Sequence, residues 1–133
     1  MAKYVFPVIL TPEETGLYAA NFPDLASCYT QGSDLADVLD ASADVLALTL
    51  YNLEENNQPI PQPTPINNLR IVEGQITSLI CADTIEYRKF YAHKAVKKTL
   101  TIPAWLNTIA EKKEINFSAV LQKALKEELS ITE

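Results

Sequence analysis

The stretch that decides the fold is Lys97-Lys98-Thr99-Leu100-Thr101-Ile102-Pro103, and it leads directly into Ala104-Trp105-Leu106. Polar and apolar residues alternate along most of it, with the two-residue period of a β-strand that exposes one face. A proline ends the alternation, and proline suits the first turn of a helix. We therefore predict a short strand over residues 97–102, followed by helices.

This C-terminal segment needs a second copy of itself. After Pro103, apolar residues recur at helical spacing in two runs, separated by a turn at residues 114–117. A lone strand cannot satisfy its own edges, and roughly thirty-five residues cannot bury a self-sufficient core. Two copies paired antiparallel would form a two-stranded ribbon that fits the major groove of DNA. This arrangement, the ribbon-helix-helix, is our prediction for residues 97–133.

The polar face of the predicted ribbon supplies candidate base-reading residues. Lysine donates to guanine acceptors, and threonine contacts a base edge or a thymine methyl group. The start of the second helix, with Ser118 as its predicted N-cap, has free N–H groups that suit a phosphate. The alternative is an ordinary exposed strand face. The candidate DNA-binding residues are Lys94, Lys97, Thr99, Thr101, Asn116 and Ser118.

The two parts of the chain carry opposite net charges. Residues 1–87 contain two basic and twelve acidic residues, a net charge of −10, whereas residues 88–133 contain nine basic and five acidic residues, a net charge of +4. Such asymmetry indicates two surfaces with different partners. We divide the chain into an acidic domain over residues 1–87, a basic linker over 88–96 and the module over 97–133.

The acidic part favours an antiparallel sheet packed on one helix. Turn residues separate three strand-like runs, and Pro7 limits the first of them to an edge or a bulge. A helix of about twenty residues then begins at Ser33 or Asp34. Four prolines between residues 59 and 65 predict a long loop inside the domain, before segments that join the sheet edge. The predicted strands span residues 4–10, 17–22, 27–31, 69–72 and 75–82.

No enzymatic site is predicted. Metal-dependent hydrolysis needs several converging carboxylates, and the first three predicted strands contain no internal acid. His93 is the only histidine and has no nucleophile or carboxylate beside it in the sequence, so we expect neither a triad nor a metal site. No cofactor is implied. No apolar run approaches the roughly 18–20 residues of a membrane span, and a soluble cytoplasmic protein is the expectation.

Two motifs resemble a known family. Residues 99–103 followed by Asn116-Phe117-Ser118-Ala119-Val120-Leu121 are similar to the ribbon-helix-helix of small bacterial repressors. Phe22-Pro23-Asp24-Leu25 with Cys28 and Gln31-Gly32 resembles a segment of HicB antitoxins, although Ala26-Ser27 replaces the usual proline-glycine of that segment. Glu114 likewise stands where a glycine often closes the first helix. The resemblance implies an α+β chain with an N-terminal βββαβ partial ribonuclease-H-like domain and a C-terminal ribbon-helix-helix.

The same resemblance implies the function of an antitoxin. The acidic domain would bind and block a HicA-like toxin, a small basic ribonuclease, and the C-terminal module would repress the chain's own operon by binding double-stranded operator DNA. The chain would be a homodimer, or a tetramer. The acidic candidates for toxin contacts are Glu13, Glu14, Asp24, Asp34 and Asp37. Two alternatives stay open: a plain repressor whose N-terminal domain senses a ligand or mediates oligomerisation, and a metal-dependent nuclease.

Overall fold

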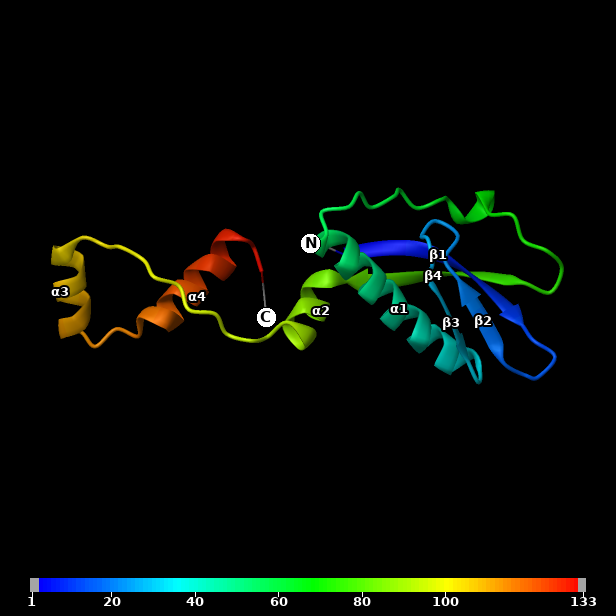
Figure 1. Cartoon of the computed structure of the whole chain (residues 1–133), viewed down its shortest axis with the longest axis horizontal. Coiled ribbons are helices and arrows are strands. Elements are labelled where there is room, and N and C mark those ends of the chain that lie inside the picture. Colours follow the sequence, from blue (N-terminus) through cyan, green and yellow to red (C-terminus); the bar gives the residue numbers. More distant parts are fainter. Residues whose placement is uncertain (1–2, 132–133) are drawn as a thin grey trace. The chain divides into compact units, whose positions relative to one another are not determined.

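Two units, Met1–Lys94 and Ala95–Glu133, make up the chain in the computed structural model, which describes residues 3–131 (Figure 1). The first unit is an antiparallel sheet with helices, and the second contains two helices without a strand among the described residues. The predicted α+β class is confirmed. The first unit extends past the predicted boundary at residue 87, because a helix that crosses this position packs on the first unit.

The sheet has four strands in the order β3-β2-β1-β4, and all neighbours are antiparallel. The first three strands form the predicted meander, and the fourth joins its β1 edge as expected. The strands are β1 (Lys3–Pro12), β2 (Tyr18–Asn21), β3 (Tyr29–Gly32) and β4 (Ile76–Asp83).

Pro7 lies in a strand that is central in the sheet order, yet its missing N–H is tolerated. The ladder between β1 and β2 covers only Ile9–Pro12 of β1, whereas the ladder to β4 covers residues 3–10. At Pro7, β1 therefore has a strand neighbour on one side only. The prediction that this proline needs an edge holds locally, because β2 is too short to reach it.

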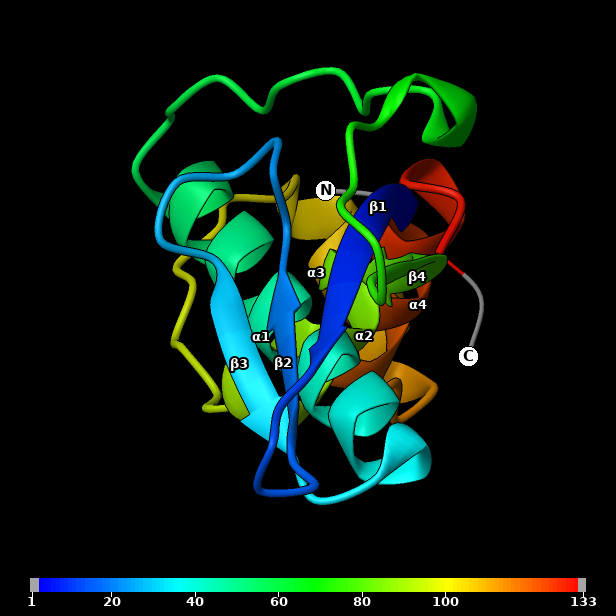
Figure 2. The same ribbon diagram turned by 90° about the vertical axis from the view of Figure 1, so that its right-hand side faces the viewer.

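Helix α1 (Leu35–Glu55) packs against one face of the sheet (Figure 2). Of the two predicted caps, Ser33 and Asp34, the aspartate caps the helix by accepting a hydrogen bond from the backbone N–H of Asp37 at 2.8 Å. Gly32 permits β3 to lie close to the start of α1, because a Cβ atom at this position would lie 2.4 Å from the backbone nitrogen of Val38. The buried apolar residues between sheet and helix include Phe6, Val8, Leu10, Val38, Leu46 and Leu50.

A long loop with one short helical turn, η1 (Ile66–Asn68), connects α1 to β4. The side chain of Asp24, between β2 and β3, holds this loop by accepting from the backbone N–H of Thr64 at 3.0 Å and from its Oγ1 at 2.5 Å. The predicted strand over residues 69–72 is wrong. Val72 and Gln75 close a turn instead, which uses backbone groups that a ladder would need.

The first unit ends with α2 (Thr84–Tyr91), which packs against α1. Asp83 caps it by accepting hydrogen bonds from the backbone N–H groups of Ile85 at 2.9 Å and Glu86 at 3.1 Å. Residues 92–103 follow, exposed and without a helix or a strand. The strand predicted over 97–102 therefore has no pairing partner in the single chain, and the ribbon stays a prediction about two copies.

The second unit contains α3 (Ala104–Lys112) and α4 (Phe117–Glu128). Asn116, and not Ser118 as predicted, caps α4 by accepting from the backbone N–H of Ala119 at 3.1 Å. The helix begins one residue before Ser118, so the serine lies inside its first turn. Glu114, in the turn between the helices, adopts a positive φ of 53°. This is the left-handed conformation that favours glycine.

Candidate functional site

The predicted acidic contact residues lie at two ends of the first unit. The loop between β1 and β2, which contains Glu13 and Glu14, lies at the same end as the start of α1 (Figures 1 and 2). Asp34 and Asp37 are at that helix start. Asp24 belongs to the loop between β2 and β3, which lies at the opposite end (Figure 2). The structure thus brings four of the five residues to one end and separates the fifth.

Three of these carboxylates already serve the fold. Asp34 caps α1, and Asp37 accepts from the backbone N–H of Ser33 at 2.8 Å and from its hydroxyl at 3.2 Å. Asp24 holds the long loop through Thr64. Asp34 and Asp37 are exposed, and their remaining lone pairs can still accept hydrogen bonds from a partner. Their hydrogen bonds at the start of α1 nevertheless explain the presence of both carboxylates without a partner. Glu13 and Glu14 are exposed.

A buried carboxylate joins the two helices of the first unit. Glu54 accepts from the Tyr4 hydroxyl and the Thr84 hydroxyl, both at 2.9 Å, and from Nη2 of Arg88 at 3.1 Å. Arg88 also donates to Glu55. Burial opposes ionisation of Glu54, but hydrogen bonds to the carboxylate, these three among them, favour it, and the pKa of the carboxyl lies below its ordinary value. Arg88, placed in the basic linker from the sequence, is therefore part of the first unit.

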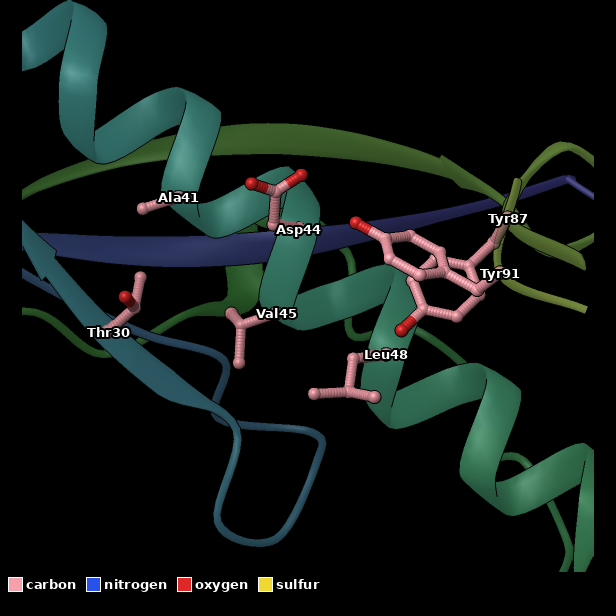
Figure 3. A pocket seen from close by; sticks show the side chains of 7 residues that line it. All are labelled: Thr30, Ala41, Asp44, Val45, Leu48, Tyr87 and Tyr91. Atoms are coloured by element: carbon pink, nitrogen blue, oxygen red, sulfur yellow. The ribbon is translucent and has the colours of Figure 1, made fainter.

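Beside this cluster is an open hollow of about 410 Å³ between β3, α1 and α2 (Figure 3). Sequence reasoning did not find it, because its residues come from three separate elements. The one available signal was the pair of tyrosines at positions 87 and 91, which the four-residue spacing of a helix places on one side. The lining residues are Thr30, Ala41, Asp44, Val45, Leu48, Tyr87 and Tyr91.

The second unit leaves its apolar residues uncovered in the single chain. Within residues 95–131 no residue is buried, and Trp105 is 66% exposed. Leu106 and Ile109 on α3, and Val120 and Leu125 on α4, are also exposed. Two helices with exposed apolar stripes of this kind require a covering surface. This finding agrees with the need for a second copy that the sequence indicates.

Four of the six predicted DNA-binding residues lie in the unpaired segment before α3, and the other two lie at the start of α4. Lys94, Lys97, Thr99 and Thr101 are exposed and lie in the stretch without helix or strand. Ser118 is exposed in the first turn of α4, and the side-chain oxygen of Asn116 caps that helix. Lys97, Thr99 and Thr101 share one face only if the segment pairs as a strand.

The described residues give no indication of metal chemistry. Among residues 3–131, no group of three or more His, Cys, Asp or Glu side chains is placed to hold a metal ion. No helix in the same range is long and apolar enough to cross a membrane.

Comparison with known proteins gives a match over nearly the whole chain. The sequence model of the family described as "HicB_like antitoxin of bacterial toxin-antitoxin system" matches residues 6–125. Antitoxin HicB of Escherichia coli K12 is 36% identical over 63 residues, which are 47% of this chain and 46% of that protein. The chain therefore matches somewhat less than half the length of this curated relative.

Two solved structures are similar in fold. A toxin-antitoxin complex from Streptococcus pneumoniae contains a chain with a TM-score of 0.62 and 25% identity, and the match covers 95% of this chain and 99% of that one. A chain of the HicA3 and HicB3 toxin-antitoxin complex has a TM-score of 0.51 and 21% identity, over 60% of this chain and 99% of that one. The second likeness concerns the fold alone.

Proposed function

Because the chain belongs to the HicB-like family of bacterial antitoxins, we propose that it binds and blocks a HicA-like ribonuclease toxin and represses its own operon. The family match over residues 6–125 carries this proposal, since it spans both units. The membership expected from the two sequence motifs is confirmed, and the antitoxin role follows from it. The identity of the toxin, the operator and the dimer belong to the proposal.

The first unit is the proposed toxin-binding part. Its strand and helix order, β1-β2-β3-α1-β4, supports assignment to a partial ribonuclease-H-like fold. Residues 1–94 contain twelve acidic and five basic residues, a net charge of −7, which suits a basic ribonuclease, because complementary charge accelerates encounter and selects the partner. In this role the unit covers the RNA-binding surface of the toxin and carries out no chemistry of its own.

The second unit is the proposed DNA-binding part. Pairing residues 97–102 of two chains would give the segment its missing ladder, and the exposed apolar residues of α3 and α4 would form the dimer core. Lys97, Thr99 and Thr101 of both chains would then lie on one face of the ribbon and read bases. A two-fold axis through the ribbon makes the operator palindromic.

Co-expression with the product of the neighbouring gene tests the proposal. A small basic ribonuclease should co-purify with the full chain, and the chain should suppress its cleavage of RNA. In a gel-shift assay, the purified chain should bind and retard promoter DNA of the same operon. Operator binding by a chain that neither captures nor inhibits the toxin would instead identify a plain repressor.

A further inference from the structure

The hollow beside α2 combines a carboxylate, aromatic rings and an aliphatic wall (Figure 3). Asp44, Val45 and Leu48 line it from α1, and Tyr87 and Tyr91 line it from α2. Leu48 is 43% exposed and Tyr91 is 64% exposed, so the hollow is open to a protruding side chain. All of these residues belong to the first unit, and the hollow is complete without the second.

The tyrosines form a continuous row of rings. The centroids of Tyr51 and Tyr87 are 5.1 Å apart, and those of Tyr87 and Tyr91 are 4.5 Å apart. Cζ of Arg88 lies 4.7 Å from the centroid of Tyr51, within the range of a cation–π contact. One end of the row thus already carries a guanidinium group. Tyr87 and Tyr91 line the hollow, and the ring centroid of Phe90 lies 4.8 Å from that of Tyr91.

Asp44 places a negative charge at the same hollow. Burial and then the neighbouring Tyr91 and Tyr51 raise the pKa of Tyr87, and the charge of Asp44 adds to the shift in the same direction. Asp40, one turn earlier on α1, is also exposed but does not line the hollow. Of these two exposed helix acids, only Asp44 combines its charge with an aromatic surface.

We propose that this hollow receives one basic side chain, an arginine by preference, from the RNA-binding surface of the toxin. The guanidinium would lie between Asp44 and the ring of Tyr91, and the aliphatic part of the side chain would pack on Leu48. A planar guanidinium suits this hollow because it can pair with a carboxylate and stack on an aromatic ring at the same time. This inference rests on the proposed function. It assigns part of the free energy of toxin binding to this one hollow.

The inference extends the charge argument from a whole surface to a single contact. An arginine that contacts RNA phosphate would be withdrawn from RNA while it occupies the hollow. Interfaces concentrate their binding free energy in a few residues, and tyrosine and arginine are prominent among them. The acidic candidates Asp34 and Asp37, which cap and stabilise the start of α1, would then contribute mainly long-range attraction.

Isothermal titration of the full-length chain with a catalytically inactive toxin tests the inference. Asp44→Asn and Tyr91→Ala should each weaken binding by about tenfold or more, as expected for residues at the centre of a contact. The matched controls are Asp40→Asn, which removes the same charge outside the hollow, and Tyr29→Ala, which removes an exposed tyrosine ring that does not line it. Each control should change the dissociation constant by less than about threefold.

Each outcome has a defined meaning. Equal losses for Asp44→Asn and Asp40→Asn would show diffuse attraction and overturn the assignment of the hollow, as would unchanged affinity for Asp44→Asn and Tyr91→Ala. Absence of any binding by the unsubstituted chain would overturn the proposed function together with this inference. A double-mutant cycle, with each toxin arginine and lysine in turn changed to glutamine, should find one basic residue whose effect is not additive with Asp44→Asn. Additivity for every toxin arginine and lysine would reject the contact.

Discussion

Nη2 of Arg88 on α2 lies 3.1 Å from Oε1 of Glu54 on α1, and the side chain of Glu54 is only 7% exposed. The pair joins residues that are 34 positions apart in the sequence. It attaches α2 to the first unit and sets the point at which the chain leaves that unit. Three of the predictions below follow from this contact or from the fold that it completes.

A fragment of residues 1–94 should fold and inhibit the toxin, whereas a fragment of residues 1–87 should be less stable and inhibit it less well. The shorter fragment lacks Arg88, loses the hydrogen bond from this side chain to the buried Glu54 and interrupts α2. Circular dichroism in urea and an RNA-cleavage assay with the toxin would measure both effects. Equal stability and equal inhibition by the two fragments would show that α2 is dispensable.

Arg88→Met should destabilise the first unit by about 2 kcal/mol, because it removes charged hydrogen bonds from a buried carboxylate. The matched control is Lys89→Met at the next position. Lys89 pairs with Glu86 at 3.0 Å on the surface, and exposed pairs contribute at most about 1 kcal/mol. Urea unfolding of the 1–94 fragment provides the comparison. A similar loss in both variants would contradict a special role for Arg88.

The stability of the first unit should depend on pH through Glu54. Its pKa in the folded chain is below the ordinary value of 4.5, so its contribution is complete above that value and is lost as the pH falls through the lower folded pKa. Glu54→Gln removes this contribution. The unfolding free energies of the two proteins should differ most near neutral pH and converge in acid. A gap that stays constant across the titration would refute the role of this carboxyl.

Ser27→Gly should stabilise the first unit by about 1 kcal/mol. Ser27 has a φ of 56°, and the left-handed conformation costs a residue with a Cβ atom roughly this amount. Gly16→Ala is the mirror control. Gly16 has a φ of 87°, and nothing lies within 4 Å of a Cβ atom added there. The Gly16→Ala protein should therefore be less stable through backbone strain alone. Thermal or urea unfolding should show shifts of opposite sign for the two substitutions.

Lys97→Ala or Thr101→Ala should abolish operator binding and leave toxin inhibition unchanged. Each lost base contact costs about 1–3 kcal/mol, and the two-fold symmetry of the proposed dimer applies the loss twice. Lys123→Ala, a charge removed from α4 outside the predicted strand, should weaken binding far less. A gel shift with the chain's own promoter measures this, and unchanged affinity of the Lys97 and Thr101 variants would reject the predicted ribbon.

Local signals in the sequence were sufficient for most of the first unit. Strand-like runs separated by turn residues predicted the meander, and Ser33-Asp34 before a helical pattern predicted a cap at one of these two residues. The strand expected at residues 69–72 failed because β-forming residues also tolerate a turn, and the hydrogen bonds of Gln75 with Val72 decide between the two. The cap of α4 was placed two residues late, since Asn116 and Ser118 are both good capping residues.

Roles that depend on distant contacts could not be read in this way. Arg88 begins a basic run, and nothing near it in the sequence points to Glu54 as its partner. Asp24 stands in a turn, where an exposed carboxylate suggests binding, but Thr64 lies 40 residues away. The hollow beside α2 combines three elements and has no motif. The strand predicted at residues 97–102 depends on a second chain in our proposal, so the structure of one copy does not test it.

The exposed connector over residues 92–96, between α2 and the predicted strand, would give the two proposed activities separate lifetimes. Proteases cut most readily in exposed segments that lack regular structure, and these residues would remain such a segment when the predicted ribbon pairs. One cut there would release a first unit that still holds the toxin but no longer has a DNA-binding part. Transcription of the operon would then resume while the existing toxin stayed inhibited. Cleavage of a single peptide bond would therefore restart synthesis of the antitoxin before any toxin was released.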